Sequence, residues 1–511
     1  MDNKLKKDNK TKILIAGHCS LDPLGRHIIS FLKCLLQDNR NEIYIEKSYL
    51  LGDTKTLEEF FKEELEKKLI KFDTNLPYDT KFDFLIFTDS LSLFPGQGWE
   101  YRLIKRNAHI KICYPVFDGS IPPLHWISVI NKNFDICLCT SDYCSHNLKR
   151  YGVRIDCFCL ECGVLIDDYL KISQKTSKKE KKFRFGSIGA SDFRKNLPLL
   201  MESFSSTFKK DDNVELFIHS SYGKDLTCDN EIEIAYKKYS KYSNIILQTK
   251  RISHKEMIDL WSSFDAYISP QTTTGYFTTP LEACAVGIPT ILSDIHPHKE
   301  LEKFIPPKDN LFYVKHSRIT PAFHWVFDYQ ILGCKFEGDK NEYIKVLNHV
   351  HSNRNKLNTV NLVNQRKTHA EKLSFLHLSK KYNNLIHPEK IFQSKHSRIQ
   401  NDAFYMSKKL AKKYSFFNKA VLTSPSNLYK EIVYPEENLE IFKVIEKCAI
   451  DNQKIFLRKL KFNAPDLFLN NKWQHEIFRK AKKYSVTQIP YFIYKLFSAY
   501  CKFKHLLSKI K

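Results

Sequence analysis

Long apolar runs are missing from this sequence. None of its 511 residues belongs to a stretch of about 18 consecutive apolar residues, so no transmembrane helix is expected. Residues 13–17 are apolar, but this stretch is too short for the hydrophobic region of a secretory signal. We therefore expect a cytoplasmic protein whose 14 cysteines are thiols rather than disulfide partners.

Two nucleotide-related motifs are missing as well. No G-x-G-x-x-G follows the first apolar stretch, which excludes the usual dinucleotide-binding fingerprint. No RNA-binding motif is visible either. Because positive charge alone does not make such a motif, we expect no nucleic-acid partner.

The cysteines between residues 137 and 162 raise the question of a zinc site, because Cys159 and Cys162 form a C-x-x-C pair. Zinc sites normally need a second well-spaced pair on turns. Cys137 and Cys139 lie instead within an expected strand, as do Cys157 and Cys159, so each pair shares one face at a period of two. Packing thiols are favoured over a metal site, and no metal is expected.

What the sequence does contain is enough apolar material for more than one core. Apolar residues make up 42% and aromatic residues 13%, and the length suggests two to four domains. The formal net charge of +24 points to anionic partners such as phosphate-rich ligands or a membrane surface. Most of this positive charge lies after residue 388.

Apolar strands alternate with helical patterns along the chain, which predicts α/β domains with parallel sheets. We expect an N-terminal Rossmann-like domain (1–170), a polar hinge (171–182) and a second Rossmann-like domain (183–371). A helix crossing back to the first domain (372–388) and a basic, mostly helical extension (389–511) complete the prediction.

The stretch 252–300 holds the clearest candidate site. Its strand 266–269 is followed by a Thr/Gly loop and a helix for which Thr279 is the expected N-cap, with Glu282 at the third position. Gly287 is expected to end that helix. In parallel sheets, ligands bind outside the carboxyl ends of the strands, so chemistry is expected at the loop 271–279.

A second loop of this kind follows the strand 183–188. Arg194 and Lys195 come just before an expected helix with Asn196 as N-cap and Pro198 in its first turn. Two cations beside a helix N-terminus favour binding of a diphosphate. The alternative is a pair of solvated surface charges.

Five short motifs stand in and around the loop after residue 269: Ser269-Pro270, Gly275-Tyr276-Phe277, Pro280-Leu281-Glu282-Ala283, Gly287-x-Pro289 and Ser293-Asp294. Together they closely resemble the donor-binding half of the retaining group 1 glycosyltransferases (family 4, GT-B fold). The resemblance covers about residues 12–385 and fits poorly at 323–339, which we interpret as an insertion. It implies two Rossmann-like domains facing a cleft, and transfer of a sugar, with retention, from a nucleotide-sugar to a hydroxyl acceptor.

Two donor positions depart from the family pattern. The first of two family glutamates is Thr274 here, and an arginine position is Ala190. Lys195 matches the family lysine, and Arg194 is a candidate for the missing charge. These departures leave an inactive, transferase-derived binding or scaffold protein as an alternative, while a phosphorylase lacks support from any PLP lysine motif.

The resemblance also implies roles for the loop residues. Glu282 would accept hydrogen bonds from the ribose hydroxyls, although it also fits a capping box with Thr279. The amides of Gly275, Tyr276 and Phe277 would face the sugar or diphosphate. Lys195 and Arg194 would neutralise the leaving diphosphate, and because no D-x-D lies in a strand-end loop, we expect neither a metal nor another cofactor.

The resemblance also implies that Gly25 and Arg26, in the first domain, approach the donor phosphates from across the cleft. The alternative is a turn glycine followed by a solvated arginine. Asp118 falls at the end of an expected strand, facing the cleft. It would orient the acceptor or act as a general base, unless it only turns the loop before Gly119.

The end of the chain predicts a basic amphipathic helix with a polar stripe (Lys495, Ser498, Lys502, His505, Lys509). Such a helix suits an anionic membrane surface, or it docks on the protein itself. A membrane-seeking tail would favour a peripheral enzyme at the cytoplasmic face, with a surface-polysaccharide or glycolipid acceptor.

Overall fold

The computed structural model describes residues 10–20, 25–52, 54–73, 76–89, 91, 106–163, 166–172, 182–221, 226–324, 330–387 and 450. Two predictions therefore lie outside the described residues. They are the polar hinge over 173–181 and, apart from residue 450, the basic extension 389–511.

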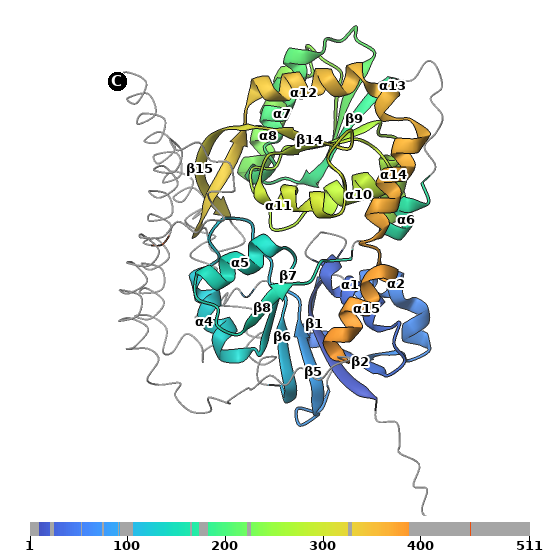
Figure 1. Cartoon of the computed structure of the whole chain (residues 1–511), viewed down its shortest axis with the longest axis vertical. Helices are drawn as coiled ribbons and strands as arrows, with labels where there is room; N and C mark the ends of the chain where they lie inside the picture. Colours follow the sequence, from blue (N-terminus) through green and yellow to red (C-terminus); the bar gives the residue numbers. More distant parts are fainter. Residues whose placement is uncertain are drawn as a thin grey trace, which may run out of the picture.

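The first lobe contains an eight-stranded parallel sheet in the order β4-β2-β1-β5-β6-β7-β8, with β3 paired to β1. Its strands are β1 (Thr11–Cys19), β2 (Asn41–Glu46), β3 (Leu50–Gly52), β4 (Ile70–Asp73), β5 (Phe82–Phe87), β6 (Ala108–Cys113), β7 (Ile136–Cys139) and β8 (Asp156–Cys159). Its helices are α1 (Arg26–Leu35), η1 (Lys47–Tyr49), α2 (Thr54–Glu66), α4 (Leu124–Asn133) and α5 (Asp142–Arg150). The next helix, α6 (Ile166–Leu170), packs on the second lobe instead (Figure 1). Consecutive residues of β1 are fully buried, as expected for a strand covered by helices on both faces.

The second lobe contains a six-stranded parallel sheet in the order β11-β10-β9-β12-β13-β14. Its strands are β9 (Phe183–Ala190), β10 (Val214–Ser221), β11 (Ile245–Gln248), β12 (Ala266–Ser269), β13 (Thr290–Ser293) and β14 (Leu311–Val314). Its helices are η2 (Phe193–Lys195), α7 (Leu197–Thr207), α8 (Leu226–Tyr239), α9 (His254–Trp261), α10 (Thr278–Val286), α11 (His296–Lys299), η3 (Glu300–Lys303), α12 (Lys340–Ser352), α13 (Arg354–Leu357) and α14 (Val360–Glu371). Two doubly wound parallel sheets confirm the predicted fold class (Figure 1).

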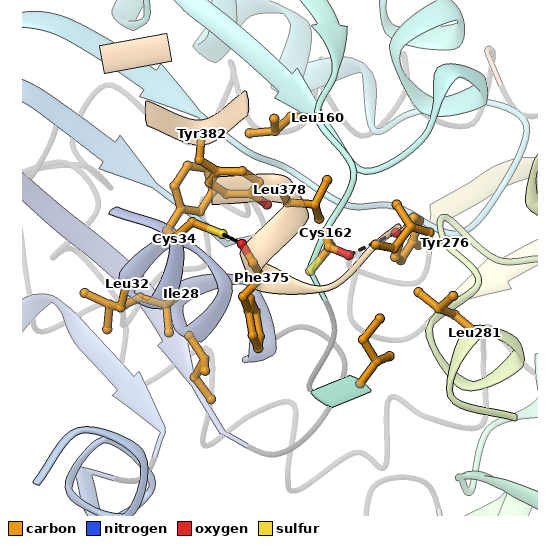
Figure 2. Close-up of a cluster of buried hydrophobic side chains, with 14 of the residues drawn as sticks. Ile28, Leu32, Cys34, Leu160, Cys162, Tyr276, Leu281, Phe375, Leu378 and Tyr382 are labelled. Atoms are coloured by element: carbon orange, nitrogen blue, oxygen red, sulfur yellow. Dashed lines mark hydrogen bonds between the residues drawn. The ribbon is translucent and has the colours of Figure 1, made fainter. Parts of the chain in front are cut away.

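A last helix, α15 (Phe375–Ile386), follows the second lobe but packs on α1 of the first lobe (Figure 1). The rings of Phe31 and Tyr382 lie 4.8 Å apart there. Figure 2 shows that this apolar cluster continues to Tyr276, whose hydroxyl donates to the Cys162 carbonyl at 3.0 Å. The two lobes therefore share one hydrophobic core along this side.

A β-hairpin joins the lobes on another side. Strands β15 (His316–His324) and β16 (Gln330–Gly338) pair antiparallel and extend from the second lobe toward the first (Figure 1). The hairpin begins at His316, before the segment 323–339 that the sequence predicts as an insertion, and β16 lies within that segment. We call β15 and β16 the strap hairpin.

Among the described residues, no helix is both long and apolar enough to cross a membrane.

Candidate active site

The helix α10 ends as predicted and starts differently. Gly287 follows its last residue with φ of 93°, a left-handed conformation that glycine adopts without strain. At the other end the helix starts at Thr278 after Phe277, and no side chain caps it. The predicted capping box between Thr279 and Glu282 is therefore wrong, because the Glu282 carboxylate binds a cation from the other lobe instead.

That cation is Arg26, at the first position of α1. Arg26 Nη1 and Glu282 Oε1 form a buried ion pair, with side chains that are 9% and 2% exposed. Burial raises the pKa of the Glu282 carboxyl, and the Arg26 charge and hydrogen bond oppose that rise. The alternative of a solvated Arg26 is therefore wrong. Gly25 just before it lies so close to Ser20 that a Cβ would meet the Ser20 backbone nitrogen at 2.2 Å.

Asp118 connects the first lobe to the loop that follows β12. The Gly275 amide donates to Asp118 Oδ1 at 2.7 Å, and Arg194 Nε lies 3.2 Å from Asp118 Oδ2. Asp118 therefore does more than turn its own loop. The Gly275 carbonyl accepts from the hydroxyls of Thr140 and Ser141 at 3.2 and 2.9 Å, so this peptide unit is held on both sides by the first lobe.

Arg194 is a partly buried cation between carboxylates, 18% exposed, rather than a solvated surface charge. Its Nη1 donates to Gln271 Oε1 at 3.2 Å, and its Nε lies 3.4 Å from Asp192 Oδ2. Burial lowers the pKa of the guanidinium, but Asp118 and Asp192 outweigh it, so the net pKa is raised. Arg194 therefore stays charged. An anion that approaches Arg194 would also be repelled by the carboxylates of Asp118 and Asp192.

Lys195 is also buried, with 8% of its surface exposed. It closes η2 immediately before Asn196, which has a left-handed backbone (φ 48°) at the start of α7. The Asn196 side chain makes no capping bond, although its position at the helix start was predicted. The Lys195 side chain passes over Gly189, where a Cβ would meet its Cδ at 3.2 Å.

His298 in α11 was missed by sequence reasoning. Burial lowers its pKa to about 4, and the charge of Lys195 adds to the shift. Its Nδ1 lies 2.9 Å from the Ser293 carbonyl, which can only accept, so Nδ1 carries the proton and Nε2 is an acceptor. A histidine shortly after the Ser293-Asp294 motif was the only local signal for it.

Several polar atoms at this edge have no hydrogen-bond partner within the part of the chain that the structure describes. They are Ser191 Oγ, Asn196 Nδ2, Ser220 Oγ and His298 Nε2. Ser191 directly follows β9, and Ser220, near the end of β10, pairs with Gly189, over which the Lys195 side chain passes. Buried polar groups are normally paired in proteins, so such a concentration is typical of a site that binds a polar ligand.

The loop amides predicted to face a donor are partly engaged already. Thr274 Oγ1 donates to the Tyr276 carbonyl at 2.7 Å and lies 3.4 Å from the Tyr276 amide. The rings of Tyr276 and Phe277 are tilted by 33° with centroids 4.2 Å apart, and both side chains are buried. Thr274 thus closes a turn within the loop, at the position where the family pattern has a carboxylate.

Glu300 forms a second contact between the lobes that the sequence did not indicate. Its carboxylate accepts from the amides of Asp142 and Tyr143, at 3.0 and 2.7 Å, at the N-terminus of α5. Lys303 Nζ lies 2.7 Å from Asp142 Oδ2 and 3.2 Å from Glu300 Oε2. This contact is independent of the Asp118 contact and fixes the lobes at another point.

The cysteine strands place three thiols together. Cys137, Cys139 and Cys157 have sulfur atoms within 4.8 Å of one another on β7 and β8. Burial raises the pKa of Cys137 to about 11 and raises that of Cys139 well above its usual value. Protonated thiols in an apolar core fit the packing interpretation.

Residues 168–303, which include Lys195, Thr274 and Glu282, match the sequence model of the family described as glycosyl transferases group 1. A search of curated proteins finds no match. Solved structures share the fold at low identity. HepE from Anabaena in complex with UDP and glucose is 12% identical with a TM-score of 0.53, covering 74% of this chain and all of that chain.

A sucrose-phosphate synthase from Thermosynechococcus elongatus is 12% identical with a TM-score of 0.51, covering 74% of this chain and 98% of that chain. A glycosyltransferase from Rickettsia africae is 13% identical with a TM-score of 0.51, covering 75% of this chain and all of that chain. The shared fold confirms the prediction of a GT-B fold, and the family match over residues 168–303 supports the prediction of a glycosyltransferase.

Proposed function

We propose that this protein transfers a sugar from a nucleotide-sugar to a hydroxyl acceptor, with retention at the anomeric carbon and without a bound metal. The observation that carries the proposal is the placement of Lys195 and Glu282 at the same edge of the second-lobe sheet. They are buried beyond the carboxyl ends of the neighbouring strands β9 and β12, inside the segment that matches the family.

The reaction breaks the bond between the anomeric carbon and the diphosphate, whose charge grows in the transition state. Lys195 and the N-terminus of α7 would stabilise that charge, since both supply positive potential at a buried site. Glu282 would accept hydrogen bonds from the ribose hydroxyls. Asp118 would orient the acceptor hydroxyl or take its proton.

The acceptor and the location remain parts of this proposal. A surface polysaccharide or glycolipid acceptor and attachment to the cytoplasmic face of a membrane are supported by the basic, aromatic residues after position 388. Because HepE was solved with UDP and with UDP-glucose, UDP-sugars are the first donors to test.

An inactive, transferase-derived binding protein is the second candidate. Thr274 and Ala190 favour it, because both stand where the family pattern has a charged residue. The two candidates differ in turnover: only the first hydrolyses or transfers a donor sugar.

The test is slow donor hydrolysis and transfer, followed by NMR of the released anomer with and without EDTA. We expect turnover to survive EDTA, the α or β configuration of the donor to be kept, and Lys195→Ala to lose activity. Lys340→Ala is the matched control, since this lysine pairs with Glu202 away from the site. An inverted product or activity lost with EDTA would overturn retention or metal independence.

A further inference from the structure

Three groups assigned to the donor above are held by side chains of the opposite lobe. Asp118 takes both the Gly275 amide and the Arg194 guanidinium, at 2.7 and 3.2 Å. Arg26 takes the Glu282 carboxylate. The Asp118 carboxylate is an anion that accepts from a backbone amide and faces a guanidinium. A donor phosphate bound at the same place would also be an anion and would use the same two hydrogen-bond donors.

The strap hairpin holds the loop that carries Asp118. The Ile121 amide donates to the Leu332 carbonyl at 3.1 Å, and the Cys334 amide donates to Ser120 Oγ at 2.9 Å. At Gly119 the approach is so close that a Cβ would meet the Leu332 oxygen at 2.3 Å. The loop is therefore anchored immediately after Asp118.

The same hairpin also grips the donor loop of the second lobe. The Phe336 amide donates to the Thr272 carbonyl at 2.7 Å, and the Thr272 amide donates to the Arg194 carbonyl at 2.7 Å. One chain of hydrogen bonds thus runs from the loop of Asp118 through the hairpin to Arg194. The contact between Asp118 and Arg194 is built by the fold rather than left to two flexible side chains.

We propose that Asp118 is a built-in competitor of the donor, whose carboxylate occupies the place of a donor phosphate between Gly275 and Arg194. This inference rests on the proposed function, and it takes Arg194 and the Gly275 amide as donor-binding groups, as the family resemblance implies. Donor binding then exchanges one anion for another, because a phosphate and Asp118 cannot both pair closely with the same guanidinium and amide.

The exchange has a consequence for the order of binding. A donor phosphate that displaces Asp118 releases its carboxylate into the cleft, where it becomes available to the acceptor hydroxyl. The donor would therefore bind first and the acceptor second. Such an order couples the arrival of the donor to the exposure of the group proposed to orient the acceptor.

The experiment measures binding of inorganic pyrophosphate, which is independent of the donor base, and of UDP, GDP, ADP and CDP by calorimetry. We expect Asp118→Ala to bind pyrophosphate and the matching nucleotide at least about fivefold more tightly than the wild type, the lower range of typical coupling between competing contacts. Asp118→Asn keeps an oxygen that can accept from the Gly275 amide but removes the negative charge that faces Arg194. The nucleotide affinity of this variant should therefore lie between those of the wild type and Asp118→Ala. An Asp118 variant that transfers sugar more slowly than the wild type can still bind nucleotide more tightly. Such tighter binding indicates that Asp118 competes with the donor, whereas a merely structural role of Asp118 would not tighten binding.

Asp142→Asn is the matched control, because it removes another aspartate that pairs with a cation of the opposite lobe, at Lys303. We expect its nucleotide affinity to equal that of the wild type. Hydrogen exchange gives a second readout without any nucleotide: amides of the loop 271–279 should exchange faster in Asp118→Ala and unchanged in Asp142→Asn.

Unchanged or weaker binding in both Asp118 variants, with wild-type nucleotide binding present, would overturn the competition and leave the proposed function standing. If no variant binds pyrophosphate or any of the four nucleotides at millimolar concentration, the proposed function fails and the competition fails with it. The two failures are therefore distinguishable by the wild-type titration alone.

Discussion

The buried ion pair between Arg26 and Glu282 makes the stability of an Arg26→Ala variant depend on pH. Removing Arg26 leaves a carboxylate that is 2% exposed without its counter-charge. Breaking a buried pair in this way typically costs about 3–5 kcal/mol. The Glu282 carboxylate can avoid this cost by taking up a proton.

The proton limits the loss of stability. Holding a glutamate with an unfolded pKa of 4.5 protonated at pH 7 costs about 3.4 kcal/mol, and at pH 5 only about 0.8 kcal/mol. A carboxyl whose folded pKa is raised contributes stability that is full below its unfolded pKa and is lost as the pH rises. Arg26→Ala should therefore be destabilised by about 3 kcal/mol at pH 7 and by about 1 kcal/mol at pH 5.

Thermal and urea unfolding at both pH values measure this effect. The double variant Arg26→Ala/Glu282→Gln has no buried charge, so it should regain most of the stability at pH 7. Arg40→Ala, which removes an exposed pair with Asp38, is the control and should change stability little at either pH. A loss of stability that is the same at pH 7 and pH 5, without rescue in the double variant, would refute the reasoning.

Three further predictions follow from other contacts. Gly275→Ala should lower the Tm and weaken nucleotide binding, since a Cβ would meet the Phe117 carbonyl oxygen at 2.5 Å; calorimetry with normal affinity would contradict this. Gly333→Ala should speed amide exchange in residues 117–121, because a Cβ at position 333 would meet Ser120 Oγ at 2.1 Å and φ is 80° there. Unchanged exchange would contradict the claim that the strap hairpin anchors the loop of Asp118. Burial lowers the pKa of His298 to about 4, so neutral His298 contributes to the free energy of unfolding above pH 6.5. This stabilisation is lost as the pH falls toward 4, by about 2 kcal/mol at pH 5. The Tm of His298→Gln should therefore fall less than that of the wild type between pH 7 and pH 5, and parallel curves would disprove it.

The local parts of the site could be predicted from the sequence. Apolar runs bounded by turn residues marked β9, β12 and β13, and Gly287 marked the end of α10, because strand burial and left-handed backbone have local signatures. Lys195 was placed beside a helix N-terminus for the same reason. These predictions needed only neighbouring residues.

The partners of these residues could not be predicted, because they come from distant parts of the chain. Arg26 and Glu282 are 256 positions apart, and Asp118 and Gly275 are 157 apart. The capping box at Thr279 was the best local partner for Glu282, but the buried guanidinium competes for the same oxygens. Glu300 illustrates the same limit, since the α5 amides that it binds come close only after the lobes have docked.

Turnover of nucleotide-sugars tests the central claim most directly. UDP-, GDP-, ADP- and CMP-linked sugars are incubated with the wild type, Lys195→Ala and Glu282→Ala, and release of the nucleotide is measured. We expect the wild type to hydrolyse one donor slowly and both substitutions to abolish the release. No binding or turnover of any donor at millimolar concentration by the folded wild type would contradict it, and would favour a binding protein that has lost the reaction.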